Sequence, residues 1–180
     1  MGRQRAFRLF DYVYGLLHSP EYTNRFAAEL GKMIPRIPMA EDFWAFASAG
    51  AALADWHLGY ESVEPWPLDG LPDESADPKH LRVEKMRFAT KADRGSIVVN
   101  RHVTLSGIPQ DAHRYQVNGR SAVEWILDRY QVKTDPASGI VNDPNTWSKD
   151  PRYIVDLLAR IVAVSLESVA IVERLPPLGI

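Results

Sequence analysis

Residues 97–105 read IVVNRHVTL, in which two short runs of apolar, mostly β-branched residues flank a polar Asn-Arg-His connection. Such runs are typical of short strands. An alternating stretch begins just upstream at residues 81–87, and YQV at 115–117 offers one more strand. Because helical patterns precede and follow this region, the sequence predicts an α+β fold, with N-terminal helices, a small mostly antiparallel sheet in the middle and C-terminal helices.

The helical patterns consist of apolar residues that recur at spacings of three and four, bounded by residues that favour helix ends. Ser19 and Pro20 suit a helix start, because a serine side chain accepts from an early backbone N–H and proline fits the first helical position. Ser121 and Glu124 match a capping box. IPRIP at residues 34–38 should be extended, since each proline disfavours the helical region for the residue before it. The predicted helices cover residues 4–17, 20–30, 41–58, 122–130 and 151–174, and a long structured loop is predicted over residues 131–149. The apolar residues of the last helix are too numerous for one stripe, so this helix is expected to be buried on several sides.

Length and composition predict one globular domain of 180 residues, of which 46% are hydrophobic and 24% charged. No apolar run approaches the roughly 20 residues that are needed to cross a bilayer. The lack of cysteine excludes disulfides, thiolate metal sites and a cysteine nucleophile, and it fits a cytoplasmic location. The expected parts of the domain are a helical part at 1–59, an acidic connection at 60–80, a sheet-containing part at 81–120 and a helical part at 121–180.

The formal net charge of −2 conceals strongly unlike segments. Residues 37–78 carry nine Asp or Glu and no Lys or Arg, whereas residues 79–133 carry eleven basic and five acidic side chains. This distribution permits one basic face on a protein that is nearly neutral as a whole. It is equally compatible with acidic and basic segments that neutralise each other in space.

The most basic stretch runs from Lys79 to Arg101, with seven basic and two acidic residues. Arg and Asn can hydrogen-bond base edges in pairs, while Lys mainly neutralises phosphate, so this stretch suggests DNA binding. The alternative is a solvated sheet face that pairs with the acidic residues 60–78. Glycine-rich phosphate loops, nucleophile elbows and paired metal-ligating histidines do not occur in the sequence, so no catalytic residue and no metal site are predicted. The candidate DNA-binding residues are Arg36, Lys85, Arg87, Lys91, Arg94, Asn100, Arg101 and His102.

Several ordered blocks of the sequence resemble a known family. The blocks are FDYVYGLLHSPEY at 10–22, PRIP at 35–38, LADWHL at 53–58, VEKMRF at 83–88, TLSGIP at 104–109, YQVNGRSA at 115–122, DRYQV at 128–132 and GIVNDP at 139–144. Together they resemble the C-terminal specificity region of type ISP enzymes, the single-polypeptide, ATP-dependent restriction–modification enzymes that are often called predicted helicases. In that family a nuclease, an ATPase motor and an adenine-N6 methyltransferase precede the recognition region, and none of their motifs occurs in these 180 residues.

The resemblance implies a target-recognition part, a fragment of a larger recognition domain, that catalyses nothing by itself. Such a part would bind double-stranded DNA and position one adenine for the methyltransferase, with the nuclease and motor carried elsewhere in the parent chain. S-adenosylmethionine, ATP and Mg are expected for the parent enzyme, and no cofactor is expected in this chain. The alternative is a protein-interaction module in which the helices over 4–33 and 151–174 dock the methyltransferase or motor domain. An exposed apolar helix face would favour that alternative.

Overall fold

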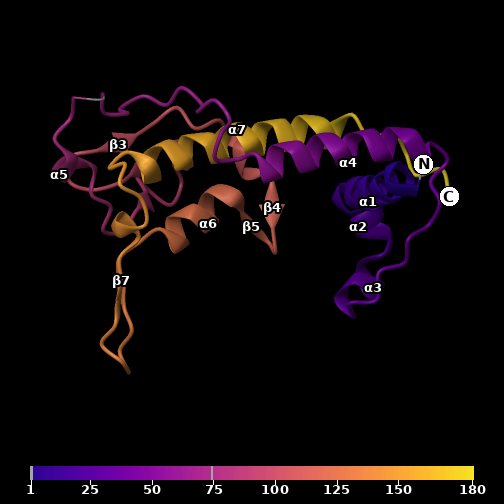
Figure 1. Ribbon diagram of the computed structural model, residues 1–180, viewed down its shortest axis with the longest axis horizontal. Helices are drawn as coiled ribbons and strands as arrows, with labels where there is room; N and C mark the ends of the chain where they lie inside the picture. Colours follow the sequence, from indigo (N-terminus) through magenta and orange to yellow (C-terminus); the bar gives the residue numbers. More distant parts are fainter. Residues whose placement is uncertain (1, 74) are drawn as a thin grey trace. The chain divides into compact units, whose positions relative to one another are not determined.

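The computed structural model describes residues 2–73 and 75–180 and has the predicted α+β fold, in which small antiparallel sheets follow the N-terminal helices along the chain and precede the long C-terminal helix (Figure 1). The helices are α1 (Gly2–His18), α2 (Pro20–Arg25), α3 (Ala27–Gly31), α4 (Phe43–Leu58), α5 (Pro78–Leu81), α6 (Ala122–Arg129) and α7 (Tyr153–Glu173), with 3-10 helices η1 (Gln110–His113) and η2 (Pro144–Thr146). The strands are β1 (Arg87–Phe88), β2 (Ile97–Val98), β3 (Thr104–Leu105), β4 (Gln116–Val117), β5 (Arg120–Ser121), β6 (Lys133–Thr134) and β7 (Val141–Asn142). Across these described residues, no helix combines the length and the apolar character that a membrane span requires.

The chain separates into two compact units. Unit 1 runs to Tyr60 and also contains Glu167–Ile180, and unit 2 comprises Glu61–Leu166. The boundary after Tyr60 falls where the sequence changes from the predicted helical part to the acidic connection. Helix α7 contributes to both units, and its apolar residues are buried on several sides, as predicted. Those buried residues include Ile154, Val155, Leu157, Leu158, Val162, Val164 and Ile171.

Unit 1 is built on the close crossing of α1 and α4. A Cβ atom added to Gly15 would lie 2.1 Å from the carbonyl oxygen of Phe46, and one added to Gly50 would lie 1.7 Å from that of Asp11. The two glycines therefore allow the helix backbones to approach more closely than any side chain would permit. The buried core around this crossing contains Tyr12, Leu16, Tyr22, Ala40, Phe46, Ala47 and Leu178.

Two core tyrosines hold the segment at residues 34–38, which was predicted to be extended. The hydroxyl of Tyr22 donates to the carbonyl oxygen of Arg36, and that of Tyr12 donates to the carbonyl oxygen of Pro38, each at 2.6 Å. Because both hydroxyls come from buried rings, the path of this segment is fixed by the core of unit 1.

The second predicted helix is broken into two. Ser19 caps α2 as expected, since its hydroxyl accepts from the backbone N–H of Tyr22 at 3.3 Å. The single helix predicted over 20–30 instead stops at Arg25, because Phe26 has φ −108° and ψ 22°, outside the helical region. The short helix α3 then restarts at Ala27.

Unit 2 is organised around an antiparallel sheet with the strand order β1-β2-β3, in which Arg87 pairs with Val98 and Ile97 with Leu105. Each strand has only two residues, so few hydrogen bonds join the strands. The burial of apolar side chains against α6 and α7 therefore contributes more to the stability of unit 2 than the hydrogen bonds between the strands. The predicted capping box of α6 is present: Ser121 Oγ accepts from Glu124 N at 3.2 Å, and Ser121 N donates to Glu124 Oε2 at 2.9 Å. The core includes Leu81, Val83, Met86, Ile97, Val99, Val103, Leu105, Val123, Leu127, Val155 and Leu158.

A hairpin replaces part of the loop predicted over residues 131–149. Strands β6 and β7 pair antiparallel, with Lys133 opposite Asn142 and Thr134 opposite Val141. The prediction was wrong here because all four strand residues are exposed, and a strand without a buried face shows no alternation of apolar and polar side chains.

We predict that Gly50→Ala destabilises unit 1 by about 1–3 kcal/mol, because the new methyl group would force α1 and α4 apart. Urea unfolding followed by circular dichroism measures this change. Gly31→Ala is the matched control, since a Cβ at Gly31 has no atom within 4 Å. An equal loss of stability in both variants would contradict the role of the helix crossing.

Candidate functional site

A cationic pocket in unit 2 gathers much of the basic stretch. Its walls come from α5, from the segment that follows α5, and from the turn between β2 and β3, and its volume is about 460 Å³. Four of the lining side chains are cationic and one, that of Glu84, is anionic. The lining residues are Lys79, Arg82, Glu84, Lys85, Val99, Asn100, Arg101 and His102.

Asn100 ties the two walls of the cationic pocket together. Its Nδ2 donates to the carbonyl oxygens of His80 and Arg82, at 2.7 and 2.9 Å. Its Oδ1 accepts from the backbone N–H groups of His102 and Val103, at 2.8 and 2.9 Å. These four bonds use both donors and both lone pairs of the amide, so Asn100 is fully engaged with the backbone.

Two histidines and an arginine meet at the same pocket. The rings of His80 and His102 have centroids 4.3 Å apart and planes inclined by 30°. Arg101 Nε donates to His102 Nε2 at 2.9 Å, an arrangement that requires an unprotonated Nε2. Reduced hydration, together with His80 and Arg101 nearby, lowers the pKa of His102. His102 therefore accepts a proton less readily than an ordinary histidine, and its protonation adds one positive charge to the pocket.

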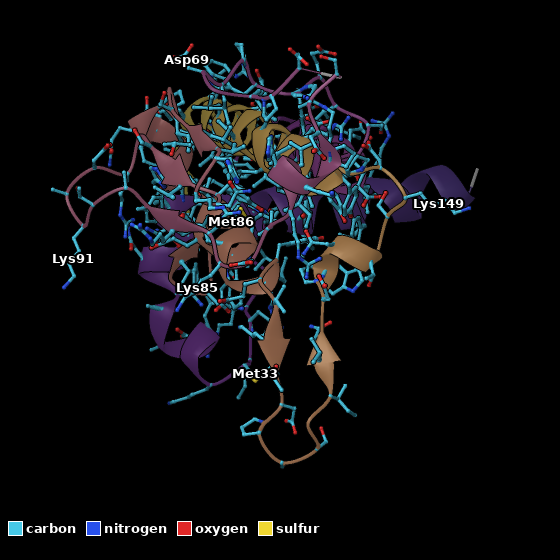
Figure 2. The ribbon with its side chains drawn as sticks, turned by 90° about the vertical axis from the view of Figure 1, so that its left-hand side faces the viewer. Met33, Asp69, Lys85, Met86, Lys91 and Lys149 are labelled. Atoms are coloured by element: carbon cyan, nitrogen blue, oxygen red, sulfur yellow. The ribbon has the colours of Figure 1, made fainter. Side chains whose placement is uncertain are left out.

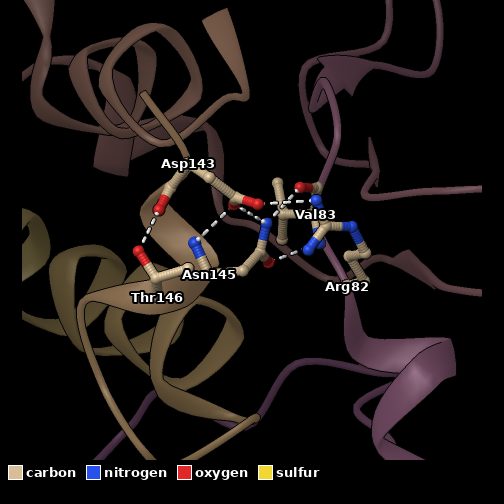
Figure 3. Close-up of polar contacts among 5 residues, drawn as sticks. All are labelled: Arg82, Val83, Asp143, Asn145 and Thr146. Atoms are coloured by element: carbon tan, nitrogen blue, oxygen red, sulfur yellow. Dashed lines mark hydrogen bonds and ion pairs between the residues drawn. The ribbon is translucent and has the colours of Figure 1, made fainter. Parts of the chain in front are cut away.

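Asn145 holds the segment that follows α5, which forms one wall of the cationic pocket, by hydrogen bonds to the backbone of Val83 (Figure 3). Asn145 Oδ1 accepts from Val83 N at 2.9 Å, and Asn145 Nδ2 donates to Val83 O at 2.8 Å. Arg82 Nη2 forms an ion pair with Asp143 Oδ2 at 2.6 Å. Hydrogen bonds from Asn145 and Arg82 lower the pKa of Asp143, so this carboxylate stays charged.

Four of the eight predicted residues line the cationic pocket, namely Lys85, Asn100, Arg101 and His102. Arg87 lies in β1 and Lys91 in the loop between β1 and β2, and both are exposed. Figure 2 shows Lys85 and Lys91 on one side of unit 2, well separated from Lys149. Unit 2 therefore carries Lys85 of the cationic pocket and Lys91 on one side.

Arg94 and Arg36 are placed differently from the other candidates. Arg94 Nη2 forms an ion pair with Glu124 Oε1 at 2.8 Å, and its guanidinium lies 5.3 Å from the ring centre of Phe88. Because Glu124 also closes the capping box, we expect Arg94 to support the start of α6. Arg36 belongs to unit 1, where its side chain is 75% exposed and lies 4.0 Å from Glu29.

Sequence reasoning missed Lys79 and Arg82 as pocket residues, although both belong to the basic stretch that it identified. The alternative to DNA binding was that the basic residues pair with the acidic residues 60–78. The ion pairs of Arg82, Arg94 and Arg120 are instead made with Asp143, Glu124 and Asp128. In the two described ranges, no group of three His, Cys, Asp or Glu side chains could hold a metal ion.

Comparisons with known proteins give a consistent assignment. Residues 4–157 match the family described as the Type ISP C-terminal specificity domain. A nuclease-deletion mutant of the Type ISP restriction–modification enzyme LlaGI, solved in complex with a DNA substrate mimic, is 43% identical with a TM-score of 0.86 over 95% of this chain. The ATP-dependent Type ISP enzyme LlaBIII bound to DNA is 38% identical with a TM-score of 0.87, again over 95% of this chain.

A cryo-EM structure of a DrdV–DNA complex is 34% identical with a TM-score of 0.78 over 94% of this chain. The chain spans 16% of the LlaGI chain, 11% of the LlaBIII chain and 18% of the DrdV chain, so it matches a small part of each. No curated protein sequence matches it.

We predict that Asn100→Ala lowers the free energy of unfolding by about 1–3 kcal/mol, because backbone groups of the turn and of the pocket wall lose their partner. Asn142→Ala, on the exposed strand β7, should change it by less than about 0.5 kcal/mol. Chemical denaturation of both variants checks this expectation. Equal stabilities would show that the turn holds its shape without the Asn100 amide.

Proposed function

Because the chain belongs to the Type ISP C-terminal specificity domain family, we propose that it is a DNA target-recognition part whose unit 2 binds double-stranded DNA. The observation that carries this proposal is the cationic pocket, whose lining has one anion and four cations, one of them (Arg82) paired with Asp143, although the whole chain has a net charge of −2. Surface cations gathered in this way are suited to neutralising phosphates. The DNA bound to LlaGI and LlaBIII supports the proposal.

The geometry assigns different tasks to the candidate residues. Lys79, Lys85 and Arg101 would neutralise backbone phosphates, which sets the position of the protein on the duplex. Lys91, which lies on the same side of unit 2 as Lys85 (Figure 2), would extend this contact, and the exposed Arg87 would add to it. Asn100, whose amide is engaged with the backbone, would shape the pocket without contacting bases.

We propose further that the chain is a non-catalytic part of a restriction–modification enzyme. Its DNA would be positioned for an adenine-N6 methyltransferase, which needs the target base flipped out of the stack. S-adenosylmethionine, ATP and Mg would be used by other parts of that enzyme. The small share of the relatives' chains that this chain covers supports such a division of labour.

Replacing Lys85 and Arg101 with alanine should weaken binding to a mixed-sequence duplex and flatten its dependence on salt. The slope of log affinity against log salt should fall by about 0.9 for each phosphate contact that is lost. Fluorescence anisotropy at several salt concentrations measures this slope. Lys149→Ala is the control, because that lysine lies on another side of unit 2 (Figure 2). A slope that is identical in the double variant and in the control would contradict the proposed phosphate contacts.

Affinity for the same duplex should rise as the pH falls below about 6.5, because protonation of His102 adds a positive charge to the pocket. The lowered pKa of His102 in the free protein puts the onset of this rise on the acid side of an ordinary histidine. His102→Gln should remove part of the rise and leave the affinity at pH 8 nearly unchanged. A pH profile that is the same with and without His102 would assign the titration to another group.

A second candidate function, docking to another protein domain, is favoured by an apolar surface in unit 1. Residues 31–37 are all exposed, and the large side chains of this surface reach 89% exposure at Met33. Its apolar members are Met33, Ile34, Ile37 and Met39. A chain that binds no duplex at low salt, while substitution of Met33 and Ile34 disrupts its attachment to the methyltransferase or motor domain, would establish this function in place of DNA binding.

A further inference from the structure

A β-ribbon arm, residues 133–142, projects from unit 2 (Figures 1 and 2). It consists of β6, β7 and the turn between them, and all ten residues are exposed. An isolated two-stranded hairpin is marginal in water, so the arm depends on how its two ends are held. A shape that buries none of its own side chains is suited to contact with another molecule.

The tip of the arm is a closed turn. Asp135 Oδ1 accepts from the backbone N–H groups of Ala137 and Ser138 and from the Ser138 hydroxyl, at 3.0, 2.7 and 2.7 Å. Asp135 N donates to Ile140 O at 2.9 Å, and Gly139 supplies the left-handed conformation with φ 70°. The tip therefore has a defined conformation, which lowers the entropy lost when it binds.

The base of the arm is fixed to the wall of the cationic pocket. On one strand, Val132 N donates to Glu84 O at 2.9 Å. Directly after β7, Asp143 pairs with Arg82, and Asn145 in η2 bonds the backbone of Val83 (Figure 3). Arg82 also lines the pocket, so the same residue joins the pocket and the arm.

The chemistry of the arm differs from that of the pocket. Its one lysine, Lys133, and its one aspartate, Asp135, cancel in charge. Its large apolar side chains, Ile140 and Val141, are 68% and 57% exposed. A neutral, partly apolar arm is poorly suited to phosphates, but it can contact thymine methyl groups and base edges.

We propose that the β6–β7 arm enters the major groove of DNA held at the cationic pocket and places Ile140 and Val141 against base edges there. This inference rests on the proposed DNA binding of unit 2. The major groove, about 12 Å wide and about 8.5 Å deep, admits a two-stranded ribbon. The arm has two ladder pairs, a third contact between Asp135 and Ile140, and the turn beyond them, so it extends about three to four residues, or about 10–13 Å at about 3.3 Å per residue. Its tip can therefore reach the groove floor while the base stays level with the phosphates.

The connection through Arg82 favours DNA over a protein partner. Phosphates bound in the pocket would lie next to the base of the arm, and the adjoining groove would be the first surface that the neutral tip meets. Readout would then be divided, with the pocket supplying position and the arm supplying discrimination between base pairs.

The test selects a preferred site for the wild-type chain from duplexes with a randomised centre. It then compares three proteins on that site and on mixed-sequence duplex, each over a range of salt. In the first, residues 135–140 are replaced by Asn-Gly, a two-residue turn that suits the retained pair Thr134 and Val141. The second carries Ile140→Ser. The control is Leu58→Ser in α4, where the side chain is 85% exposed.

The shortened arm should lose roughly 5- to 150-fold of the preference for the selected site, the range for one misread base pair, and keep the salt slope on mixed-sequence duplex. Ile140→Ser should lose part of the preference for the selected site, and Leu58→Ser should keep all of it. Replacing the site's thymines with deoxyuridine, which removes the 5-methyl group, should weaken wild-type binding and leave the shortened arm unaffected.

A shortened arm that keeps the full preference overturns the inference and points to a protein partner for the arm. Salt-dependent binding without any enriched site also overturns it, while leaving the proposed DNA binding intact. Absence of salt-dependent binding by the wild-type chain is the distinct result that overturns the proposed function itself.

Discussion

The segment at residues 80–84 imposes the constraint on which the rest of unit 2 depends. Leu81 and Val83 are buried in its core, so the backbone polar groups beside them need partners. The segment belongs to none of the described strands, and two asparagine side chains form the backbone hydrogen bonds that a neighbouring strand would otherwise form. Asn100 bonds the carbonyl oxygens of His80 and Arg82, and Asn145 bonds both backbone groups of Val83.

This arrangement explains how one short segment serves two surfaces. On the side of Asn100 the backbone supports the cationic pocket, and on the side of Asn145 it supports the β6–β7 arm. Arg82, which follows helix α5, and Glu84 are exposed, while Val83 between them is buried. The apolar core therefore determines where the charges of the pocket lie.

The sequence predicted those features that depend on residues close together in the chain. The cap at Ser19 and the capping box at Ser121 follow from local rules and are present, and residues 34–38 lie outside the helices, as their prolines require. The arm escaped prediction because its exposed strands show no alternation of apolar and polar residues, and the Asn145 clamp escaped it because Asn145 and Val83 lie 62 residues apart. The basic stretch was recognised, but the pairing of Arg94 with Glu124 could not be inferred from spacing.

Amide hydrogen exchange of the chain, with and without mixed-sequence duplex at low salt, tests most directly whether unit 2 is the surface that contacts DNA. We predict slower exchange at residues 79–85, 99–103 and 133–142 when duplex is present, with unchanged exchange at residues 31–39 of unit 1. Slowing confined to residues 31–39, or no slowing anywhere, would contradict this prediction.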